Sequence, residues 1–409
     1  MTKVLISGAS IAGPALAHWL QRAGFDVTIV EKAPALRAGG YPIDVRGTAL
    51  DAVRRMGILP RLRDLHISTE RLTFLAGDGD EVASLDANTV IGGVDGQDLE
   101  IRRGDLIHTL DDLIRDDVEI RFGDSVDTLA QREAGVDVTF RSGRQATYDL
   151  VIGADGLHSA TRELLFGDEK QFHHYLGYSF AGFTLPNDFG LHREGLVWTV
   201  PGKGAALYAV LDSKEIHGFL SFYREDPPLE AFRDPEAQRD LVAAIFADEG
   251  WEIPRLVEAM REAEDLFFDV VSQIHLPQWT DGRVALVGDA AYAPSFLTGQ
   301  GTSLALVGAY VLGHALATIP DHTKAFAAYE SRLRDFVERN QATVSHGQAT
   351  LFPTTVEALE ERNAALRQLT VAPAPTPRPE HSALTLPDFP GAAAGSAPET
   401  PRSTGGTRG

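Results

Sequence analysis

The sequence predicts an α/β protein in which a Rossmann-like dinucleotide-binding domain is interrupted by an antiparallel β-sheet and followed by C-terminal helices. Three observations carry this prediction. The chain opens with an apolar strand, a glycine-bearing turn, a helix and a second strand, which is the βαβ unit of a parallel sheet. Residues 172–224 alternate with a period of two, as strands do. Residues 322–368 carry a helical pattern.

The composition is that of a globular chain with a sizeable core. Of 409 residues, 44% are hydrophobic and 23% are charged, an ordinary balance. The absence of cysteine excludes disulfides and thiolate metal ligands, and we expect no metal centre. The net charge of −21 disfavours nucleic acid and anionic membranes as partners. We see neither a membrane-spanning apolar run nor a secretory signal, so we expect a cytoplasmic protein.

The opening turn, Gly8-Ala-Ser-Ile-Ala-Gly13, is the first candidate site. Gly8 permits a tight turn, and Gly13 lets the helix approach the strand closely. The free N–H groups at the helix N-terminus suit a pyrophosphate. Glu31 ends the second strand, 23 residues after Gly8, where a carboxylate can accept hydrogen bonds from ribose hydroxyls. Ser10 replaces the middle glycine of the fingerprint. The turn indicates a dinucleotide but does not separate FAD from NAD.

Further segments alternate between helix and strand. In order, we expect a helix over 47–66 broken at Gly57 and Pro60, a β-rich excursion over 71–101 with turns at Gly77–Asp80 and Gly92–Gln97, a helix over Arg103–Arg115, and strands over 118–122, 135–142 and 149–153. The aromatic and β-branched stretches within 172–224 predict an antiparallel sheet. Helices over 229–248 and 255–263, a strand over 283–287 and helices over 301–318 and 322–368 follow.

Two later strands each deliver an aspartate to a loop at the carboxyl end of the strand. The first runs from Asp149 into Gly-Ala-Asp155-Gly156, and the second from Gly282 into Gly288-Asp289. Ligands of open α/β sheets bind at these strand ends. Asp289 is placed to accept hydrogen bonds from ribityl hydroxyls, and the backbone N–H groups of Gly299–Gly301 can face a flavin ring edge. Each segment alone is equally a simple strand-terminating turn.

Together the three segments resemble the single-component FAD-dependent aromatic hydroxylases, the para-hydroxybenzoate hydroxylase-like family, over about residues 3–320. The order of motifs matches. The resemblance implies that Asp155-Gly156 contacts both FAD and NAD(P)H, and that Gly288-Asp289 binds the ribityl chain. Arg103 matches an arginine that contacts the flavin. The chain looks most like tetracycline-inactivating and polyketide-tailoring monooxygenases, which implies a role in antibiotic biosynthesis or resistance.

In that subgroup an arginine and an aspartate precede a helix as Arg37 and Asp44 do, which implies that Arg37 meets the nicotinamide cofactor and Asp44 the flavin region. The full predicted cofactor set is Gly8, Ser10, Ile11, Ala12, Gly13, Glu31, Lys32, Arg37, Asp44, Arg103, Asp155, Gly156, Gly288, Asp289, Pro294, Gly299, Gln300 and Gly301. We expect FAD to be bound non-covalently. NADPH or NADH would serve as co-substrate, since no second fingerprint for a stable NADPH domain is present.

The resemblance divides the chain into domains. Residues 1–70, 100–170 and 280–320 would form a discontinuous FAD-binding domain, 71–99 and 171–279 a substrate domain, 321–369 C-terminal helices and 370–409 a disordered tail. The tail assignment comes from its Pro, Ala, Gly, Ser and Thr content, which offers no spaced apolar face. Two positions depart from the family pattern: Tyr292 replaces a usual histidine and Ser303 a frequent asparagine. We expect both near the flavin.

The implied reaction is hydroxylation of an aromatic or polyketide-like small molecule. NAD(P)H reduces FAD, O2 forms a flavin C4a-hydroperoxide, and one oxygen passes to an electron-rich carbon. Catalytic residues are not identified; His217, Tyr223 and Arg224 are candidates for assisting phenol deprotonation, although surface or sheet-packing roles fit them better. Seven aromatic residues are expected to divide between the cavity and the core: Tyr178, Phe180, Phe183, Trp198, Tyr208, Phe219 and Phe222.

Three alternatives stay open at this stage. A flavin-dependent halogenase needs a Trp-x-Trp-x-Ile-Pro segment, whereas Trp198 is solitary in its stretch. A reductase or dehydrogenase would use similar motifs without oxygen insertion. A non-enzymatic protein could retain FAD for sensing or binding. The expected partners are a small aromatic substrate and O2, with the chain a monomer or a homodimer.

Overall fold

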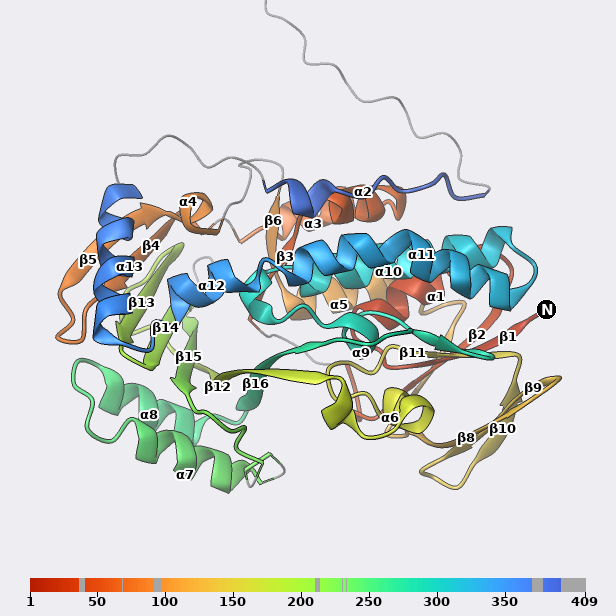
Figure 1. Cartoon of the computed structure of the whole chain (residues 1–409), viewed down its shortest axis with the longest axis horizontal. Coiled ribbons are helices and arrows are strands. Elements are labelled where there is room, and N and C mark those ends of the chain that lie inside the picture. Colours follow the sequence, from red (N-terminus) through yellow and green to blue (C-terminus); the bar gives the residue numbers. More distant parts are fainter. Residues whose placement is uncertain are drawn as a thin grey trace, which may run out of the picture.

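The computed structural model describes residues 1–36, 41–67, 69–91, 98–209, 214–229, 231–232, 234–369 and 378–390. Two large sheets organise this part of the chain (Figure 1). A six-stranded sheet carries the opening βαβ unit, and helices α1, α5, α10 and α11 lie over it. A seven-stranded sheet stands at the other end of the molecule, with α7 and α8 below it in the view. The α/β class predicted from the sequence is confirmed.

The six-stranded sheet has the order β17-β18-β11-β1-β2-β7. Its strands are β1 (Lys3–Ser7), β2 (Asp26–Glu31), β7 (Glu119–Phe122), β11 (Leu150–Gly153), β18 (Val284–Leu286) and β17 (Thr280–Asp281). All pair in parallel except β17 with β18. Their near-continuous apolar runs suit a parallel sheet buried on both faces. The sheet therefore brings the ends of β1, β11 and β18, and the loops that follow them, to one edge.

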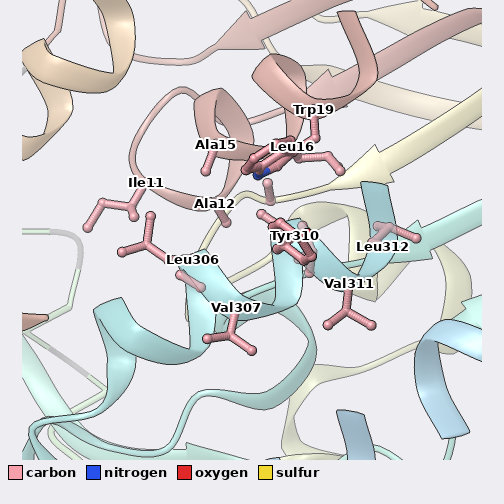
Figure 2. Packing of buried hydrophobic residues seen from close by; sticks show 14 of the residues in the cluster. Ile11, Ala12, Ala15, Leu16, Trp19, Leu306, Val307, Tyr310, Val311 and Leu312 are labelled. Carbon is pink, nitrogen blue, oxygen red and sulfur yellow. The ribbon is translucent and has the colours of Figure 1, made fainter. Parts of the chain in front are cut away.

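The main core lies between the sheet and two helices, α1 (Ala12–Arg22) and α10 (Gly301–Thr318). Figure 2 shows Ala15, Leu16 and Trp19 of α1 facing Leu306 and Tyr310 of α10. By length and composition α10 could cross a membrane, but 78% of it is buried inside the protein. We therefore describe α10 as a core helix, apolar all round because it is covered on all sides.

The seven-stranded sheet has the order β16-β12-β15-β14-β13-β4-β5. Its strands are β4 (Arg71–Leu75), β5 (Glu81–Asp86), β12 (His173–Pro186), β13 (Glu194–Val200), β14 (Lys203–Ala209), β15 (Glu215–Tyr223) and β16 (Phe267–Ile274). The predicted period-two segments form β12 to β15. The prediction of an antiparallel sheet over residues 172–224 is confirmed, since β12, β15, β14 and β13 pair antiparallel. Outside that stretch, β4 joins β13 in parallel. That pairing arises because β4 enters from a distant segment rather than by a hairpin.

Two small sheets were not anticipated. One contains β8 (Val126–Arg132), β9 (Gly135–Phe140) and β10 (Gln145–Tyr148); in the other, β3 (Pro42–Val45) pairs antiparallel with β6 (Leu99–Arg102). The second sheet joins segments more than 50 residues apart, so no local pattern could reveal it. It lies next to the candidate site described below.

Most of the remaining helices follow the predicted order, whereas α4 and α9 were not predicted. They are α2 (Thr48–Arg55), α3 (Leu59–Asp64), α4 (Ala87–Ile91), α5 (Arg103–Asp112), α6 (Ala160–Phe166), α7 (Pro235–Ile245), α8 (Ile253–Glu262), α9 (Asp289–Tyr292), α11 (His322–Gln341), α12 (Val344–Leu351) and α13 (Val356–Leu369). Helices α7 and α8 cover one face of the seven-stranded sheet through a cluster that includes Trp198, Phe222 and Leu256. The opposite face of that sheet is left to line a cavity.

The prediction of a disordered tail is wrong for residues 378–390, which we call the C-terminal strap. A short 3-10 turn (Pro379–Ser382) begins it, and Leu386 and Phe389 are buried in the main core. Its backbone carbonyls accept hydrogen bonds from Thr48, Arg55 and Tyr310. Average composition concealed these anchors, because a few apolar residues on an extended segment suffice when a groove receives them. Residues 370–377 and 391–409 lie outside the described residues.

Candidate functional site

A single cavity of about 900 Å³ joins the carboxyl edge of the six-stranded sheet to the uncovered face of the seven-stranded sheet. Its volume lies at the upper end of what ligand pockets of proteins span. One end is lined by the β1–α1 turn and the loop after β2, and the other by aromatic side chains of β12, β14, β15 and β16. The cavity therefore spans the predicted dinucleotide site and the predicted substrate sheet.

The β1–α1 turn needs glycine at both of its ends. Gly8 has a φ of +112°, and a Cβ there would collide with the carbonyl of Ala154. A Cβ on Gly13 would overlap the carbonyl oxygen of Gly8. The turn is therefore as tight as the dinucleotide fingerprint requires, and the N-terminus of α1 opens directly onto the cavity.

Glu31 extends from the end of β2 across this turn. Its Oε2 accepts the Ala9 N–H at 2.9 Å, and its Oε1 accepts the Ala33 N–H at 2.8 Å. Both contacts fix the carboxylate against the cavity wall, beside Lys32. A carboxylate fixed in this place suits ribose hydroxyls, as the sequence predicts.

Ser10, the departure from the fingerprint, has a contact of its own. The Arg103 guanidinium donates from Nη2 to the Ser10 hydroxyl at 3.0 Å. Arg103 begins α5, and its guanidinium also lies over the ring of Tyr41, 5.9 Å from the ring centre. A glycine at position 10 could not accept this bond. The serine therefore helps to hold a cation at the middle of the cavity.

The Asp155 carboxylate accepts hydrogen bonds from residues that follow it closely in the chain. Its carboxylate accepts the Ser159 hydroxyl at 2.5 Å and both the N–H and the hydroxyl of Thr161 at 2.9 Å. These bonds satisfy free donors at the start of α6. Gly156, with a φ of +83° and open space around it, leaves the adjoining backbone accessible from the cavity. Asp155 thus holds the first turn of α6 against this wall, while Ser159 is the N-cap of the helix.

His158 is a site residue that the sequence analysis missed. Its Nδ1 lies 2.7 Å from Glu169, and its Nε2 lies 3.1 Å from Asp269 on β16. Hydrogen bonds to Asp269 and Glu169 raise the pKa of His158 to about 9. The imidazolium therefore ties the loop after β11 to the seven-stranded sheet at neutral pH. The histidine follows Asp155-Gly156 closely in sequence, but nothing there indicates its partner on β16.

Asp289 is the carboxylate at the end of β18. Gly288, with a φ of +67°, turns the chain into α9, and the exposed Asp289 lines the cavity. Burial raises the pKa of Asp289, and the positive charge of Arg103 opposes that increase. A carboxylate in a cavity needs hydrogen-bond donors, which polyol hydroxyls would supply.

The loop before α10 completes this wall. Gly299 has a φ of +65°, and a Cβ there would lie 3.0 Å from Asp44 Oδ2. Asp44 is held in turn by Arg46, whose Nη2 donates to Oδ1 at 2.7 Å. The Gln300 side chain donates back to the Gly299 carbonyl at 3.3 Å. Glycine at position 299 therefore lets backbone and carboxylate meet without a side chain between them.

The structure brings most predicted cofactor residues to the cavity. Those that line it are Gly8, Ser10, Ile11, Ala12, Glu31, Lys32, Asp44, Arg103, Asp155, Gly156, Asp289, Pro294, Gly299 and Gly301. Gly13, Gly288 and Gln300 lie behind the wall and shape its backbone. Arg37 lies outside the described residues.

Tyr292 and Ser303, the two departures from the family pattern, lie away from the cavity. Tyr292 is buried in the core against Trp279, with ring centres 4.6 Å apart, and neither residue lines the cavity. A tyrosine there points inward because Gly308 leaves room for its hydroxyl. Ser303 is buried and accepts the Arg46 N–H at 3.1 Å.

The predicted aromatic set divides between the two faces of the seven-stranded sheet, as expected. Phe180, Tyr208 and Phe219 face the cavity, together with Phe267, Phe296 and Phe352. Phe183, Phe222 and the ring of Trp198 pack toward α7 and α8. Tyr178 stacks on Phe352, with ring centres 4.5 Å apart. This end of the cavity is therefore an aromatic chamber.

The three catalytic candidates do not line the cavity. His217 lies near Thr184 on β15, with 3.4 Å between Nδ1 and the hydroxyl. Tyr223 is half exposed at the end of β15, and Arg224 follows it, its backbone N–H donating to Gly177. The strand alternation placed His217 and Tyr223 on the same face as Phe219, but beyond the two ends of the chamber.

These residues fit FAD. The N-terminus of α1, which follows the glycine turn, suits the pyrophosphate. The Glu31 carboxylate suits the ribose, and the Asp289 carboxylate suits the ribityl hydroxyls. The stretch from Gly299 to Gly301, kept free of side chains, suits the edge of a flat ring. An extended dinucleotide could thus run from the β1–α1 turn to the aromatic chamber.

Comparisons with known proteins agree with an FAD site in this cavity. A family model described as an FAD binding domain matches residues 1–344. A flavin-dependent monooxygenase from an unknown prokaryotic organism is 39% identical over 366 residues, 88% of this chain and 94% of the relative. One from Legionella longbeachae is 37% identical over 340 residues, 83% of this chain and 87% of the relative. The crystal structure of the tetracycline destructase Tet(51) has a TM-score of 0.81 and 34% identity, covering 95% of this chain and 100% of the other.

The fold and the site define an FAD-dependent oxidoreductase. More particularly, the chain belongs to the family of flavin-dependent monooxygenases that share this FAD-binding domain. The resemblance predicted from the glycine and aspartate segments is thereby confirmed, including its likeness to tetracycline-inactivating monooxygenases.

Proposed function

We propose that the protein uses NAD(P)H and O2 to hydroxylate an aromatic or polyketide-like small molecule. The observation that carries the proposal is the continuity of the cavity. A wall suited to a dinucleotide, with Asp289 and Gly299, opens without a barrier onto a chamber of aromatic rings that include Phe180 and Phe219. A ring-bearing substrate would fit between such side chains.

The chemistry is shared between FAD and the chain. When bound, FAD accepts a hydride from NAD(P)H and, once reduced, activates O2 so that one oxygen atom passes to the substrate. The chain binds the cofactor through the β1–α1 turn, Glu31 and Asp289, and Arg103 supplies positive charge at the middle of the cavity. The aromatic chamber orients the substrate and excludes water, which protects reactive species from hydrolysis.

The test is a turnover screen with FAD-loaded protein. We expect the purified protein to be yellow. In a panel of phenols, polyketides and tetracyclines, at least one compound should stimulate NADPH or NADH oxidation and gain one oxygen atom by mass spectrometry. Anaerobic reactions serve as the control and should reduce the flavin without forming oxygenated product.

Each outcome has a definite meaning. Substrate-stimulated oxidation of NAD(P)H without oxygen incorporation would identify a reductase and contradict the proposal. A folded, colourless protein that takes up no added FAD would contradict the assignment of the site itself. Absence of any stimulation across the panel would favour a protein that keeps FAD for binding or sensing.

A further inference from the structure

Two carboxylates face each other directly across the small sheet of β3 and β6. Asp44 is the register partner of Glu100 in this antiparallel pair, so their side chains lie on the same face. Both residues line the cavity. Like charges directly opposite one another on a sheet are destabilising. Keeping two carboxylates opposite each other lowers the stability of the fold. Their position at a cavity wall indicates that they serve to bind a ligand.

Glu100 has one oxygen tied down and one free toward the cavity. Its Oε2 accepts the Thr69 hydroxyl at 2.5 Å and the Thr69 N–H at 3.4 Å. Among the described residues no hydrogen bond reaches Oε1. Burial raises the pKa of Glu100, and the charge of Asp44 adds to this increase, while Thr69 and Arg46 oppose it. The free oxygen therefore lacks a donor that would stabilise its charge.

Tyr208 approaches the same carboxylates from β14 of the seven-stranded sheet. Its ring packs edge-on against Phe219, with ring centres 6.2 Å apart, and within the described part of the chain its hydroxyl receives no hydrogen bond. Burial raises the pKa of Tyr208, and the charges of Glu100 and Asp44 add to the increase. The aromatic chamber thus ends in a polar corner formed by Asp44, Glu100 and Tyr208, which we call the acidic corner.

The charge balance at this corner is negative. The positive charge that acts on Glu100 is that of Arg46, and the Arg46 guanidinium donates to Asp44 at 2.7 Å. The groups that face Glu100 from the elements around it are Asp44 and Arg46 of the β3 segment, Thr69 before β4 and Tyr208 of β14. A ligand group that donates a proton or carries positive charge would satisfy Glu100, whereas a carboxylate or phosphate would be repelled.

We propose that the acidic corner binds a proton-donating group of the substrate, an O–H or an N–H, and that Glu100 is the residue that selects for it. The inference rests on the proposed function and narrows it to ring-bearing substrates with such a donor on the edge that enters the corner. A site built to satisfy a donor rejects analogues that lack it, because a buried acceptor is then left unpaired.

The experiment compares two probes of the same ring system, one with this donor and one without it. 2-Naphthol carries an O–H, and 2-methoxynaphthalene replaces the proton with a methyl group. Dissociation constants are measured on FAD-loaded protein by calorimetry, without NAD(P)H. A hydrogen bond to a charged group corresponds to about a tenfold to hundredfold preference, so we expect 2-naphthol to bind at least about tenfold more tightly.

Variants assign the preference to Glu100. Glu100→Leu should abolish it while leaving the affinity for 2-methoxynaphthalene and the flavin content unchanged. Glu100→Gln keeps the shape of the side chain and one acceptor oxygen, so it should lower the preference for 2-naphthol several-fold. This variant replaces Glu100→Leu in the test if the leucine variant does not fold. Glu163→Gln is the matched control, since Glu163 also lines the cavity but belongs to α6 rather than to the β3–β6 sheet, and it should keep the full preference. A third probe, 2-naphthylmethylammonium, separates the two donors, because the cation should lose more affinity than 2-naphthol in Glu100→Gln.

Equal affinity of the wild-type protein for the two neutral probes, or no binding of either, would overturn the proposal. So would a preference that survives in Glu100→Leu. Failure of the proposed function is a separate result, because it is measured as absence of oxygenated product in turnover, whereas the preference is measured without turnover.

Discussion

The C-terminal strap offers the sharpest test of the packing, through Phe389→Ala. The Phe389 ring is 4% exposed and contacts three partners: its centre lies 4.7 Å from that of Trp19, 5.8 Å from Tyr310 and 6.2 Å from His314. Removing a buried phenyl ring costs about 3 to 5 kcal/mol. We take the lower value, since an edge segment relaxes more easily than a closed core, and expect a melting temperature lower by about 4 °C for a chain of this length.

Phe389→Ala should also weaken the binding of FAD. The strap holds the turn that follows Asp44 and Arg46, because the Thr48 hydroxyl donates to the Leu384 carbonyl at 2.8 Å and Gly47 lies against the His381 carbonyl without room for a Cβ. Loosening the strap therefore loosens the β3–α2 turn. We expect the affinity for FAD to fall several-fold.

Truncations provide the matched control. A chain that ends after residue 377 should reproduce and exceed the defect of Phe389→Ala, whereas a chain that ends after residue 390 should keep wild-type stability and FAD affinity. Differential scanning fluorimetry gives the first quantity and flavin fluorescence titration the second. Wild-type melting of the shorter chain would refute the reasoning, since the strap would then contribute nothing to the core.

Three other perturbations probe the cofactor site. Gly13→Ala should lower FAD affinity at least about tenfold, since its Cβ would overlap the Gly8 carbonyl oxygen; flavin retained at the wild-type level after purification would contradict the close approach. Asp289→Ala should weaken FAD binding about tenfold through lost charge-assisted hydrogen bonds, and an unchanged titration curve would remove Asp289 from the site. The pKa of His158 is raised from 6.5 to about 9, so its ion pairs stabilise the fold fully below pH 6.5 and lose this effect as the pH rises through 9. The melting-temperature difference between wild type and His158→Gln should therefore shrink from pH 6 to pH 10; a constant difference would count against the ion pairs.

The dinucleotide end of the cavity could be predicted from the sequence because its geometry is local. Gly8 and Gly13 sit in one turn, and Asp289 follows directly on a buried strand. Each of these features is imposed by backbone sterics within a few residues, so spacing along the chain reports the three-dimensional arrangement. Glu31 is far from Gly8 in sequence but could be predicted as well, because the βαβ unit fixes where the second strand ends.

The acidic corner could not be predicted in the same way, although the sequence did predict aromatic side chains such as Phe180 and Phe219 in the chamber. Asp44, Glu100 and Tyr208 come from three strands that meet only through the β3–β6 pairing and the position of β14. The candidates that the sequence offered, such as His217, lie on the correct strand but beyond the chamber. Strand alternation predicts the face on which a side chain lies, whereas its position along the cavity depends on how the two sheets are placed against each other.

The two ends of the cavity differ in how readily they tolerate substitutions. The FAD end depends on positions where a Cβ cannot be accommodated, so substitutions there are costly for backbone reasons. The chamber depends on side chains, with Phe219 and Tyr208 on strands whose backbone pairing is indifferent to residue type. Asp44 lies near both ends: a Cβ on Gly299 would come within 3.0 Å of its Oδ2, and it faces Glu100 across the small sheet. The β3–β6 sheet therefore places the proposed substrate corner at Glu100 beside the carboxylate that lies next to Gly299.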